Sequence, residues 1–462
     1  MNEQFTRRTF LKLAGVGAAG ALLAACAPKA PGTTQPAEPT KAEGEVAATP
    51  APAETKRLIF SSYTWSSFEA AMGSVIDDFV AANPDIEVER QFVPQTEDYW
   101  AKIQTQVAGG TPPDVGMSDY GHLVSYAKSG ILLSVSDLVA GSGFPIDKML
   151  PGAVAQYRWA AGDIDSGSEG GNLWGLPSDA QGQLFAYNKN MFDEAGVAYP
   201  TDDWTWNDLV AAGKAITNAD ANKWGFLVPP SGMWVRGWYA WQAGGEFVSA
   251  DFKTATFTSP GVVESIKWLW DLIYTEKIAP PPGLQAATNP FMSGQVAMTL
   301  DGIWWVADFA TITDFEWDMA MLPKHPQTGS RLTTVESDGW WIYKSTQEVE
   351  ASWRLMSYLA GEAGQAKLGD LNFVVPSNFP EVGRAWYTRT PPEHRSKALD
   401  NIVAESRKNF LTFFEVWTVL GACLPPIDAA FADGTDIQAA IEECNTVAQQ
   451  ELDKAWELLN QA

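Results

Sequence analysis

The feature that most constrains the fold is a regular alternation of strand and helix patterns between residues 57 and 119. Short apolar or alternating runs, typical of strands, fall at 58–61, 86–92 and 114–117. Between them lie two stretches with apolar side chains at helical spacing, from Phe68 to Phe79 and from Tyr99 to Val107. This β-α-β-α-β order predicts an α/β fold with a parallel sheet and right-handed crossovers.

The residues that follow these strands are the first candidates for ligand contact. In open α/β sheets, ligands bind in the crevice beyond the carboxyl ends of the strands. Those ends carry Trp65, Gln95 and Asp119. We therefore expect these three side chains to lie together at one edge of the first sheet.

The length of the chain predicts two lobes. About 400 residues follow position 57, which is more than a single hydrophobic core commonly supports. The strand and helix patterns continue through the middle of the chain, and beyond position 351 the pattern is mostly helical.

Two segments in the second half of the chain resemble each other. Asp301-Gly302-Ile303-Trp304-Trp305 and Asp338-Gly339-Trp340-Trp341 each place an acid, a glycine and paired indoles after a strand pattern. Since alternate residues of a strand face opposite sides, at most one of the two indoles at 340 and 341 can face a ligand. We expect Trp340 to be that one.

Composition excludes several classes of partner. The formal net charge is −25, from 31 basic and 56 acidic residues, which argues against nucleic acids and polyanions. The three histidines are scattered and no CxxC or HxxH motif occurs, so neither a zinc site nor a cofactor is expected. Two cysteines follow Cys26, namely Cys423 and Cys444, and the sequence leaves open whether they form a disulfide or stay as buried thiols.

The N-terminal segment has the features of an export signal. A twin-arginine stretch, Thr6–Lys12, precedes a short run of small and apolar residues that ends at Cys26. This order predicts a lipoprotein signal peptide at 1–26, with Cys26 as the lipid acceptor. Residues 27–56 are rich in Pro, Ala, Thr and Glu and contain no aromatic residue, so they are predicted to be a disordered tether. The protein is therefore expected outside the cytoplasm, anchored to a membrane by lipid.

Four further motifs resemble those of a known family. Residues 108–114 (AGGTPPD), 187–192 (YNKNMF), 204–206 (WTW) and 291–298 (FMSGQVAM), the last followed by Asp301-Gly302, are similar to family 1 extracellular solute-binding proteins of ABC importers. The motifs occur in the family's order, and the resemblance covers the chain from about residue 57 to beyond residue 377.

The resemblance implies a two-lobed, periplasmic-binding-protein-like α/β fold. Each lobe would be a mostly parallel sheet flanked by helices, and the chain would cross the hinge near 179–184, near Asp301 and near 338–341. The expected lobes are 57–181 with 302–340, and 182–301 with 341–462. A monomer would hold its ligand in the cleft between the lobes, and the membrane permease subunits would recognise the closed form.

The ligand predicted from these residues is a carbohydrate. The chain has 21 tryptophans, and an indole offers a flat apolar platform to the C–H face of a sugar, while carboxylates and amides bind its hydroxyls. We expect four platforms: Trp65, Trp234, Trp304 and Trp340. We expect six polar contacts: Gln95, Asp119, Asp179, Gln181, Asp301 and Asp338.

Three alternatives stay open at this stage. A polyamine or other cation also fits acids and indole rings, and a peptide or glycerophosphodiester would keep the same importer role. Trp238 or Trp241 could replace Trp234 as the platform. A secreted glycosidase would need two carboxylates flanking one bond, and nothing in the sequence points to hydrolysis. The protein is therefore expected not to be an enzyme.

Overall fold

The computed structural model describes most of the chain beyond residue 54. The described residues are 55–64, 68–94, 96–228, 237–283, 289–371, 379–408 and 412–461. The described residues form one compact unit. The predicted signal peptide, Cys26 and nearly all of the predicted tether therefore lie outside the described residues.

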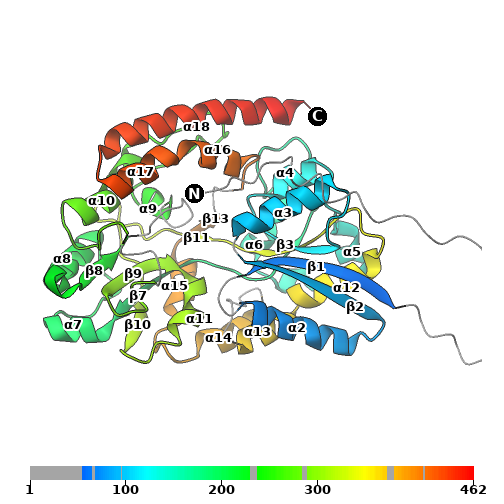
Figure 1. Ribbon diagram of the computed structural model, residues 1–462, viewed down its shortest axis with the longest axis horizontal. Helices are drawn as coiled ribbons and strands as arrows, with labels where there is room; N and C mark the ends of the chain where they lie inside the picture. The colour runs from blue at the N-terminus through cyan, green and yellow to red at the C-terminus, as the bar shows by residue number, and fades with distance from the viewer. Residues whose placement is uncertain are drawn as a thin grey trace, which may run out of the picture. The chain divides into compact units, whose positions relative to one another are not determined.

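A five-stranded sheet contains the strands predicted at the start of the fold. Its order is β2-β1-β3-β12-β6. The strands are β1 (Lys56–Thr64), β2 (Ile86–Pro94), β3 (Val115–Ser118), β6 (Leu176–Pro177) and β12 (Gly339–Ile342). Its helices are α2 (Phe68–Ala82), α3 (Thr96–Ala108), α4 (Leu123–Lys128), α5 (Ser136–Ser142), η1 (Ile146–Lys148), α6 (Pro151–Gln156), α12 (Val349–Ala360) and α13 (Glu362–Asp370). Figure 1 shows α3 and α4 on the opposite side of this sheet from α2 and α13.

The predicted β-α-β-α-β unit is confirmed. β1 pairs in parallel with β2 and with β3, and α2 and α3 are the connections between them. The apolar stripe predicted for the first helix is buried as expected, from Phe68 to Phe79. The periodicity of apolar residues was sufficient to predict these helices, because each helix buries a single continuous face.

A four-stranded sheet forms the second body of secondary structure, in the order β10-β7-β9-β8. The strands are β7 (Gln183–Asn188), β8 (Trp224–Leu227), β9 (Val296–Gly302) and β10 (Trp317–Ala320). The helices near it are α7 (Lys189–Ala195), α8 (Trp206–Ile216), η2 (Ala219–Ala221), α9 (Gly237–Gln242), α10 (Pro260–Tyr274), η3 (Ile303–Trp305), α11 (Val306–Phe309), α14 (Pro380–Tyr387) and α15 (Lys397–Ala404). Two short ladders complete the strands: β4 (Arg158–Trp159) with β5 (Asn172–Leu173), and β11 (Thr333–Val335) with β13 (Ser406–Lys408).

The two sheets are mixed rather than mostly parallel, which corrects one expectation. β12 is antiparallel to β3 and β6, and β7 is antiparallel to both β9 and β10. The reason lies in the passages between the sheets. A passage is a chain segment that connects the two sheets. β7 and β12 each begin at a passage and run away from that passage, whereas β6 and β9 each end at a passage and run toward it.

Sheet membership also differs from the expected lobe boundaries. β10 lies within the segment 302–340, which was expected in the first lobe, yet it pairs with β7 of the second sheet. β12 continues to Ile342 within the first sheet, and α12 packs on it, although residues from 341 onward were expected in the second lobe. The pairing partner of a strand is a long-range property that the local pattern does not carry.

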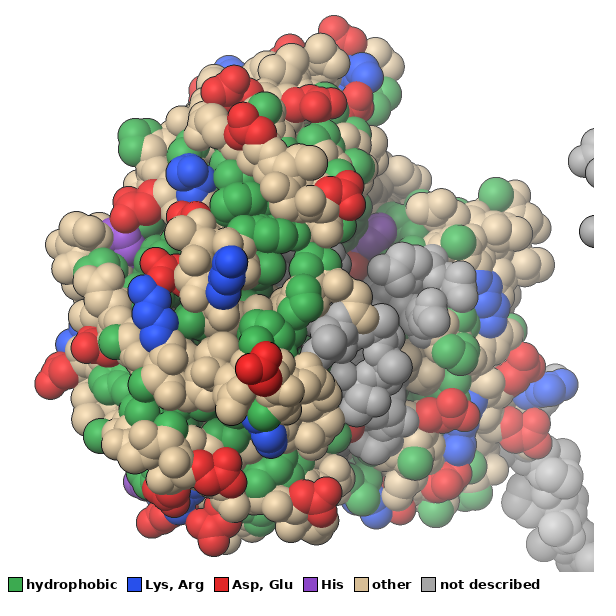
Figure 2. All heavy atoms as spheres, turned by 60° about the vertical axis from the view of Figure 1, so that its left-hand side comes forward, with side chains coloured by type: hydrophobic (Ala, Val, Ile, Leu, Met, Phe, Trp, Pro, Cys, Tyr) green, Lys and Arg blue, Asp and Glu red, His purple; other side chains and the backbone are tan. Residues whose placement is uncertain are grey.

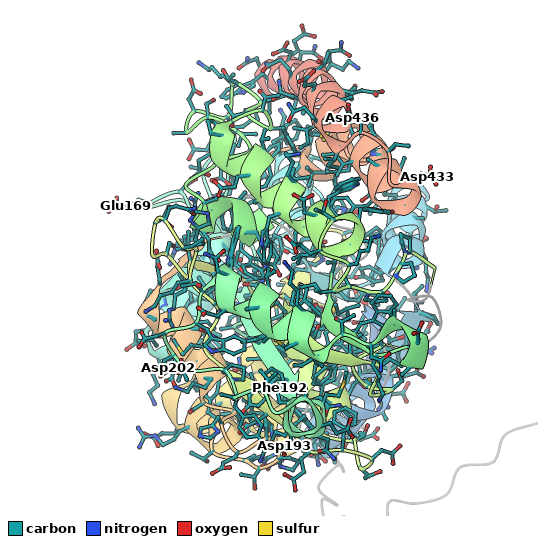
Figure 3. All side chains as sticks on the ribbon, turned by 90° about the vertical axis from the view of Figure 1, so that its left-hand side faces the viewer. Glu169, Phe192, Asp193, Asp202, Asp433 and Asp436 are labelled. Atoms are coloured by element: carbon teal, nitrogen blue, oxygen red, sulfur yellow. The ribbon has the colours of Figure 1, made fainter. Side chains whose placement is uncertain are left out.

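Three helices close the chain: α16 (Val416–Cys423), α17 (Pro425–Asp433) and α18 (Ile437–Asn460). The Asp436 side chain caps α18 by accepting from the N–H groups of Gln438 and Ala439 (Figure 3). α18 belongs to both hydrophobic cores, because its residues up to Leu452 pack in the core of the second sheet whereas Ala455 and Leu459 pack in that of the first.

The surface agrees with the acidic composition. Acidic side chains are spread over the face in Figure 2, with basic ones among them, and do not gather in one patch. Among the described residues, the structure contains no helix long and apolar enough to span a bilayer.

Candidate ligand-binding site

Three passages between the sheets meet at one place. The segment that leads into β7 and the segment that leads into β12 form a short antiparallel bridge. The N–H of Gln181 donates to the carbonyl of Glu336 at 2.7 Å, and the N–H of Glu336 donates back at 2.9 Å. The third passage, after β9, joins them because the N–H of Ile303 donates to the carbonyl of Gly182 at 3.0 Å.

Three of the predicted polar contacts touch one another at this meeting point. The amide of Gln181 donates from Nε2 to Oδ2 of Asp179 at 2.7 Å and to Oδ2 of Asp338 at 3.4 Å. The backbone N–H of Asp338 donates to Oδ1 of Asp179 at 3.0 Å. Residues 179, 181 and 338 therefore form one hydrogen-bonded group, assembled from two passages 159 positions apart.

Side chains from the first sheet extend this group. The hydroxyl of Tyr63, near the end of β1, donates to Oδ2 of Asp338 at 2.8 Å. The hydroxyl of Tyr120, just after β3, donates to Oε2 of Glu336 at 3.0 Å. Asp119 directly precedes Tyr120; burial is the main cause that raises the pKa of Tyr63 and of Asp338, and the Asp119 carboxylate adds to both rises. We call this set the crossing cluster; its members are Tyr63, Asp119, Tyr120, Asp179, Gln181, Glu336 and Asp338.

Burial changes the protonation of the carboxyl groups in the crossing cluster. Burial raises the pKa of Asp338 to about 7, although the hydrogen bond from Tyr63 acts to lower it. The Asp119 carboxylate adds to the rise. Burial and then the Asp338 carboxylate raise the pKa of Asp179 well above its usual range. Near neutral pH the cluster can therefore both accept and donate hydrogen bonds.

One carboxylate oxygen of the crossing cluster is open to a ligand. Within the described residues, Asp338 receives its side-chain hydrogen bonds at Oδ2 alone, from Tyr63 and Gln181. The side chain is partly exposed. Oδ1 is therefore placed to accept from a bound hydroxyl or ammonium group.

The predicted residues Asp301 and Trp304 lie beside the third passage. Burial raises the pKa of Asp301 to about 7, although a 2.7 Å hydrogen bond from the N–H of Gly302 acts to lower it. The indole of Trp304 folds back over Gly302, where any Cβ would overlap it. In the described part of the chain, no hydrogen bond or ion pair joins Asp301 or Trp304 to the crossing cluster. They flank it without belonging to it.

The expectation for Trp340 is wrong. Its side chain is 1% exposed and lies in the core of the first sheet, with its ring 5.4 Å from that of Phe60. Trp341, on the other face of β12, is equally buried. Both faces of β12 are covered by helices, so neither indole is available to a ligand.

Three other predicted contacts, Trp65, Gln95 and Trp234, lie outside the described residues. Trp65 directly follows β1, and Gln95 directly follows β2, as predicted. Of the alternatives to Trp234, both Trp238 and Trp241 are buried in the core of the second sheet.

Sequence reasoning missed Tyr63, Tyr120 and Glu336. Each lies one or two positions from a predicted residue, namely Trp65, Asp119 and Asp338. Since side chains two apart on an extended chain share a face, Glu336 could have been proposed with Asp338, and Tyr63 with Trp65. No local signal pairs Tyr63 with Asp338, which are 275 positions apart.

The two cysteines are neighbours in the core. Cys423 on α16 and Cys444 on α18 are both buried, and both are free thiols in the structure. A hydrogen bond with Cys423 and burial raise the pKa of Cys444. A disulfide between them stays a prediction, which peptide mapping without reductant would test.

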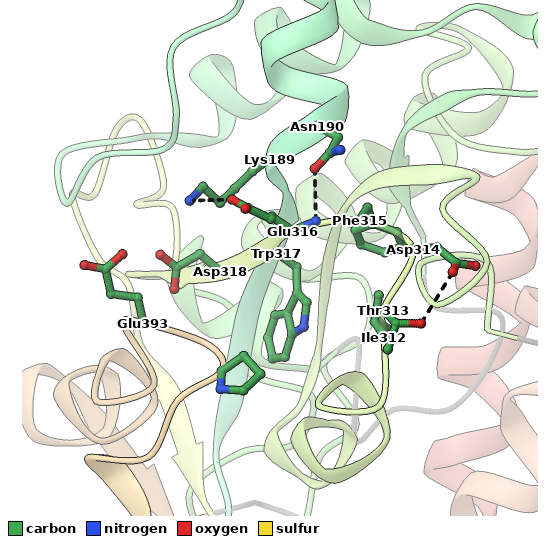
Figure 4. Close-up of a pocket in the computed structure, with 11 residues that line it drawn as sticks. Lys189, Asn190, Ile312, Thr313, Asp314, Phe315, Glu316, Trp317, Asp318 and Glu393 are labelled. Carbon is green, nitrogen blue, oxygen red and sulfur yellow. Dashed lines mark hydrogen bonds and ion pairs between the residues drawn. The ribbon is translucent and has the colours of Figure 1, made fainter.

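A pocket of about 500 Å³ lies at the other end of the second sheet (Figure 4). Asp318 and Glu393 lie side by side on one side of it, and with His394 they could meet a metal ion. Both oxygens of Asp318 already hold His394, however, through its N–H at 2.8 Å and its Nδ1 at 2.6 Å. β7 separates the pocket from the crossing cluster by about 17 Å. None of the predicted site residues that the structure describes lines it.

Known proteins resemble this chain in sequence. A binding protein of Brucella abortus is 22% identical over 340 residues, which is 70% of this chain and 77% of that protein. The sn-glycerol-3-phosphate-binding periplasmic protein UgpB of Rhizobium meliloti is 22% identical over 284 residues, 57% of this chain and 62% of UgpB.

Solved structures share the fold. The ABC substrate-binding protein Lmo0181 of Listeria monocytogenes, in complex with cycloalternan, superposes with a TM-score of 0.78 at 24% identity, covering 87% of this chain and all of that one. Maltose-bound MalE3 of T. maritima superposes with a TM-score of 0.69 at 20% identity, covering 87% of this chain and all of that one. The fold is therefore that of the periplasmic binding proteins, as expected.

The sequence pattern of one protein family matches most of the fold. The match runs from residue 74 to residue 391 and so includes every strand of the two sheets except β1, and every member of the crossing cluster except Tyr63. With the shared fold and the cluster at the meeting of three passages, the chain belongs to the family of bacterial extracellular solute-binding proteins.

Proposed function

We propose that this protein is the extracytoplasmic solute-binding component of an ABC importer and that it captures a sugar or oligosaccharide. Membership in a family of binding proteins sets aside the alternative of a secreted glycosidase. The proposal goes further in naming the transporter class and the ligand class.

The observation that carries the proposal is the crossing cluster. Four carboxyl groups, one amide and two phenols converge where the passages between the sheets meet. Such a set can satisfy several hydroxyl groups at once, since it combines acceptors with groups that can also donate. When the Asp338 carboxyl is ionised, its Oδ1 is the contact we expect to be strongest, because a charged acceptor makes a stronger hydrogen bond than a neutral one.

Ligand capture would draw the two sheets together. Asp119 and Asp338 adjoin strands of the first sheet, whereas Asp301 lies on β9 of the second, so a ligand that reached all three would contact both sheets. Binding at such a place favours the closed form, which permease subunits could recognise.

The ligands named for relatives support a hydroxyl-rich solute. Lmo0181 was solved with cycloalternan and MalE3 with maltose. UgpB is named for sn-glycerol 3-phosphate, which carries a phosphate. A phosphate ligand would need Arg or Lys groups, and the described members of the crossing cluster are acids, phenols and an amide.

A cationic ligand is the second candidate, and one observation favours it. In the described part of the chain, neither Asp338 nor Asp301 has a Lys or Arg side chain within ion-pair distance. A bound ammonium group, as in a polyamine or an amino sugar, would supply the missing charge. This candidate keeps the importer role and changes the ligand class.

The N-terminal residues complete the proposal. We infer that residues 1–26 direct export and that lipid on Cys26 holds the protein at a membrane, with residues 27–56 as the tether. Metabolic labelling with palmitate should mark the wild-type protein and leave Cys26→Ser unlabelled. Labelling of Cys26→Ser at the wild-type level would contradict the anchor.

A thermal-shift screen tests the ligand class directly. The purified protein would be heated with glucose, maltose, maltotriose, arabinotriose, spermidine and glycerol 3-phosphate. A ligand that binds only the folded state raises the melting temperature. At a hundredfold excess over Kd, it adds about 2.7 kcal/mol to the free energy of unfolding. Stabilisation by a saccharide supports the first candidate. A response to spermidine alone would transfer the assignment to the second.

A further inference from the structure

A chain of hydrogen bonds runs through the passage that leads into β12. It begins at Gln183, the first residue of β7. The amide oxygen of this side chain accepts from the hydroxyl of Thr333 and, at 3.1 Å, from the backbone N–H of Thr334. All three residues are buried. A side chain from the second sheet therefore holds the start of this passage.

The hydroxyl of Thr334 continues the chain to Glu336. It lies 2.9 Å from Oε1 of Gln183 and 2.8 Å from Oε1 of Glu336, and it has one hydrogen to donate. A carbonyl oxygen has two lone pairs, and the two donors described above fill those of Gln183. The hydrogen of the Thr334 hydroxyl is therefore directed to the carboxylate of Glu336.

The chain of hydrogen bonds ends at the loop that carries Asp119. Tyr120, directly after Asp119, donates from its hydroxyl to Oε2 of Glu336 at 3.0 Å. Each carboxylate oxygen of Glu336 thus accepts a hydrogen bond from within the protein. The ring of Tyr120 packs in the core of the second sheet, although the loop follows β3 of the first. The position of the loop therefore depends on Glu336 and on that core together.

Two side chains hold the same passage from the side of the first sheet. Gln156, the last residue of α6, donates from Nε2 to the carbonyl of Val335 at 3.0 Å. Tyr157 donates from its hydroxyl to the carbonyl of Ser337 at 2.9 Å. Glu336 lies between these two attachment points, so its backbone is fixed and its carboxylate has a constant position.

We propose that Thr334 and Glu336 are positioning residues of the ligand site. Through Tyr120, they hold Asp119 where it can contact the ligand together with Asp338. This inference rests on the proposed function, and it adds residues that act without touching the ligand. It also separates Glu336 from the other carboxyl groups of the crossing cluster, because its two oxygens hold the passage to the loop.

The turn of Asp119 and His122 reports the position of the loop without any ligand. Nδ1 of His122 faces Oδ2 of Asp119 at 2.8 Å. The imidazole stacks on the ring of Trp100, with the centroids 3.9 Å apart and the planes at 19°. The current in an aromatic ring at this distance shifts the NMR signals of the imidazole protons, so a movement of the loop changes them. The chain has three histidines, and replacing each in turn assigns the signals.

Calorimetry on matched variants tests the proposal. The probe is the saccharide that most stabilises the wild type among glucose, maltose, maltotriose and arabinotriose. Thr334→Val should weaken its binding roughly threefold, and Thr334→Ser, which keeps the hydroxyl, should bind like the wild type. Thr299→Val is the control: Thr299 on β9 is equally buried, and its hydroxyl has no hydrogen-bond partner within the described residues.

A second background separates positioning from other effects. If Thr334 acts through Asp119, adding Thr334→Val to Asp119→Asn should leave the affinity of Asp119→Asn unchanged. The His122 signals should shift in Thr334→Val and stay in place in Thr334→Ser and Thr299→Val. Tyr120→Phe removes the last hydrogen bond of the chain and repeats both measurements, should Thr334→Val fold poorly.

The outcomes separate this inference from the proposed function. A loss of affinity in Thr334→Val that is absent from the Asp119→Asn background, with shifted His122 signals, supports the positioning role. Wild-type affinity in Thr334→Val, or an equal loss in both backgrounds, overturns that role, and weakened binding in Asp338→Asn would still support the proposed function. If no saccharide binds the wild type, the proposed function fails. The His122 signals then decide alone: a shift in Thr334→Val supports the hold on the loop, and unchanged signals overturn it.

Discussion

Two aspartate–histidine pairs in this protein share their local chemistry and differ in their surroundings. In each pair, one carboxylate accepts from the backbone N–H of the histidine and faces its Nδ1. Asp119 and His122 lie in one turn, with side chains 10% and 15% exposed. Asp318 and His394 join β10 to the loop before α15, and the His394 side chain is 51% exposed.

The difference lies in what else each pair touches. The first pair adjoins three further carboxyl groups, two phenols and the aromatic group of Trp100 and Trp417. The second has one nearby acid, Glu393, and its aspartate is fully used in holding the loop. The same pair adjoins a hydrogen-bonded polar cluster in one place and holds a loop in the other, because only the first lies where the passages between the sheets meet.

The largest expected effect concerns Trp340 on β12, two residues after Asp338. Trp340→Ala should lower the free energy of unfolding by about 3–5 kcal/mol, since it empties a fully buried site. Ligand affinity of the folded fraction should stay near that of the wild type. Urea unfolding and calorimetry measure the two quantities. A large loss of affinity with normal stability would restore Trp340 as a ligand platform.

Asp318→Ala tests the anchor. Removing this carboxylate leaves three N–H groups without their acceptor, on Met319, on the His394 backbone and on its ring. The expected cost is about 2–3 kcal/mol of stability, with no change in affinity for the saccharide. Weaker ligand binding in this variant would contradict the separation of the two pairs.

Asp338→Asn tests the crossing cluster. The amide would keep its oxygen toward Tyr63 and Gln181, which both donate, and would present its NH₂ group where Oδ1 now lies. A ligand hydroxyl that donated to Oδ1 would lose its acceptor. Affinity should fall roughly 10- to 100-fold, measured by calorimetry, and stability should not fall.

The pH dependence of stability sharpens the same point. The pKa of Asp338 in the folded protein, about 7, lies above the ordinary value of about 4. Its contribution to stability is therefore complete below pH 4 and is lost as the pH rises through 7. Compared with the wild type, Asp338→Asn should gain on the order of 1 kcal/mol in unfolding free energy between pH 4 and pH 8. A difference that stays constant over this range would refute the raised pKa.

The smallest expected effect is that of Asp119→Asn. The variant keeps one acceptor for His122 and loses the charge beside Asp338, so saccharide affinity should fall roughly threefold. Equal affinities would mean that Asp119 only shapes the turn. A loss larger than that of Asp338→Asn would move the centre of the site toward the turn of Asp119 and His122.

Much of the fold and part of the site could be predicted because their causes are local. The β-α-β-α-β unit follows from periodicity, and the helix of 206–216 begins at a capping box formed by Thr205 and Asp208, which are three positions apart in the sequence. Asp179, Gln181 and Asp338 were predicted from the motifs at the passages, and they do meet. Their role in binding a ligand stays a proposal.

The sequence by itself determined where the strands and helices form and that acids follow several strands, since both depend on neighbours along the chain. Only the tertiary structure decided which of them meet. It covered both faces of β12 and so buried Trp340, it brought Tyr63 to Asp338 across 275 positions, and it packed the indole of Trp417 against Gly121, two residues after Asp119. These outcomes depend on how the two sheets pair and pack, which is a property of the whole chain and of no single segment.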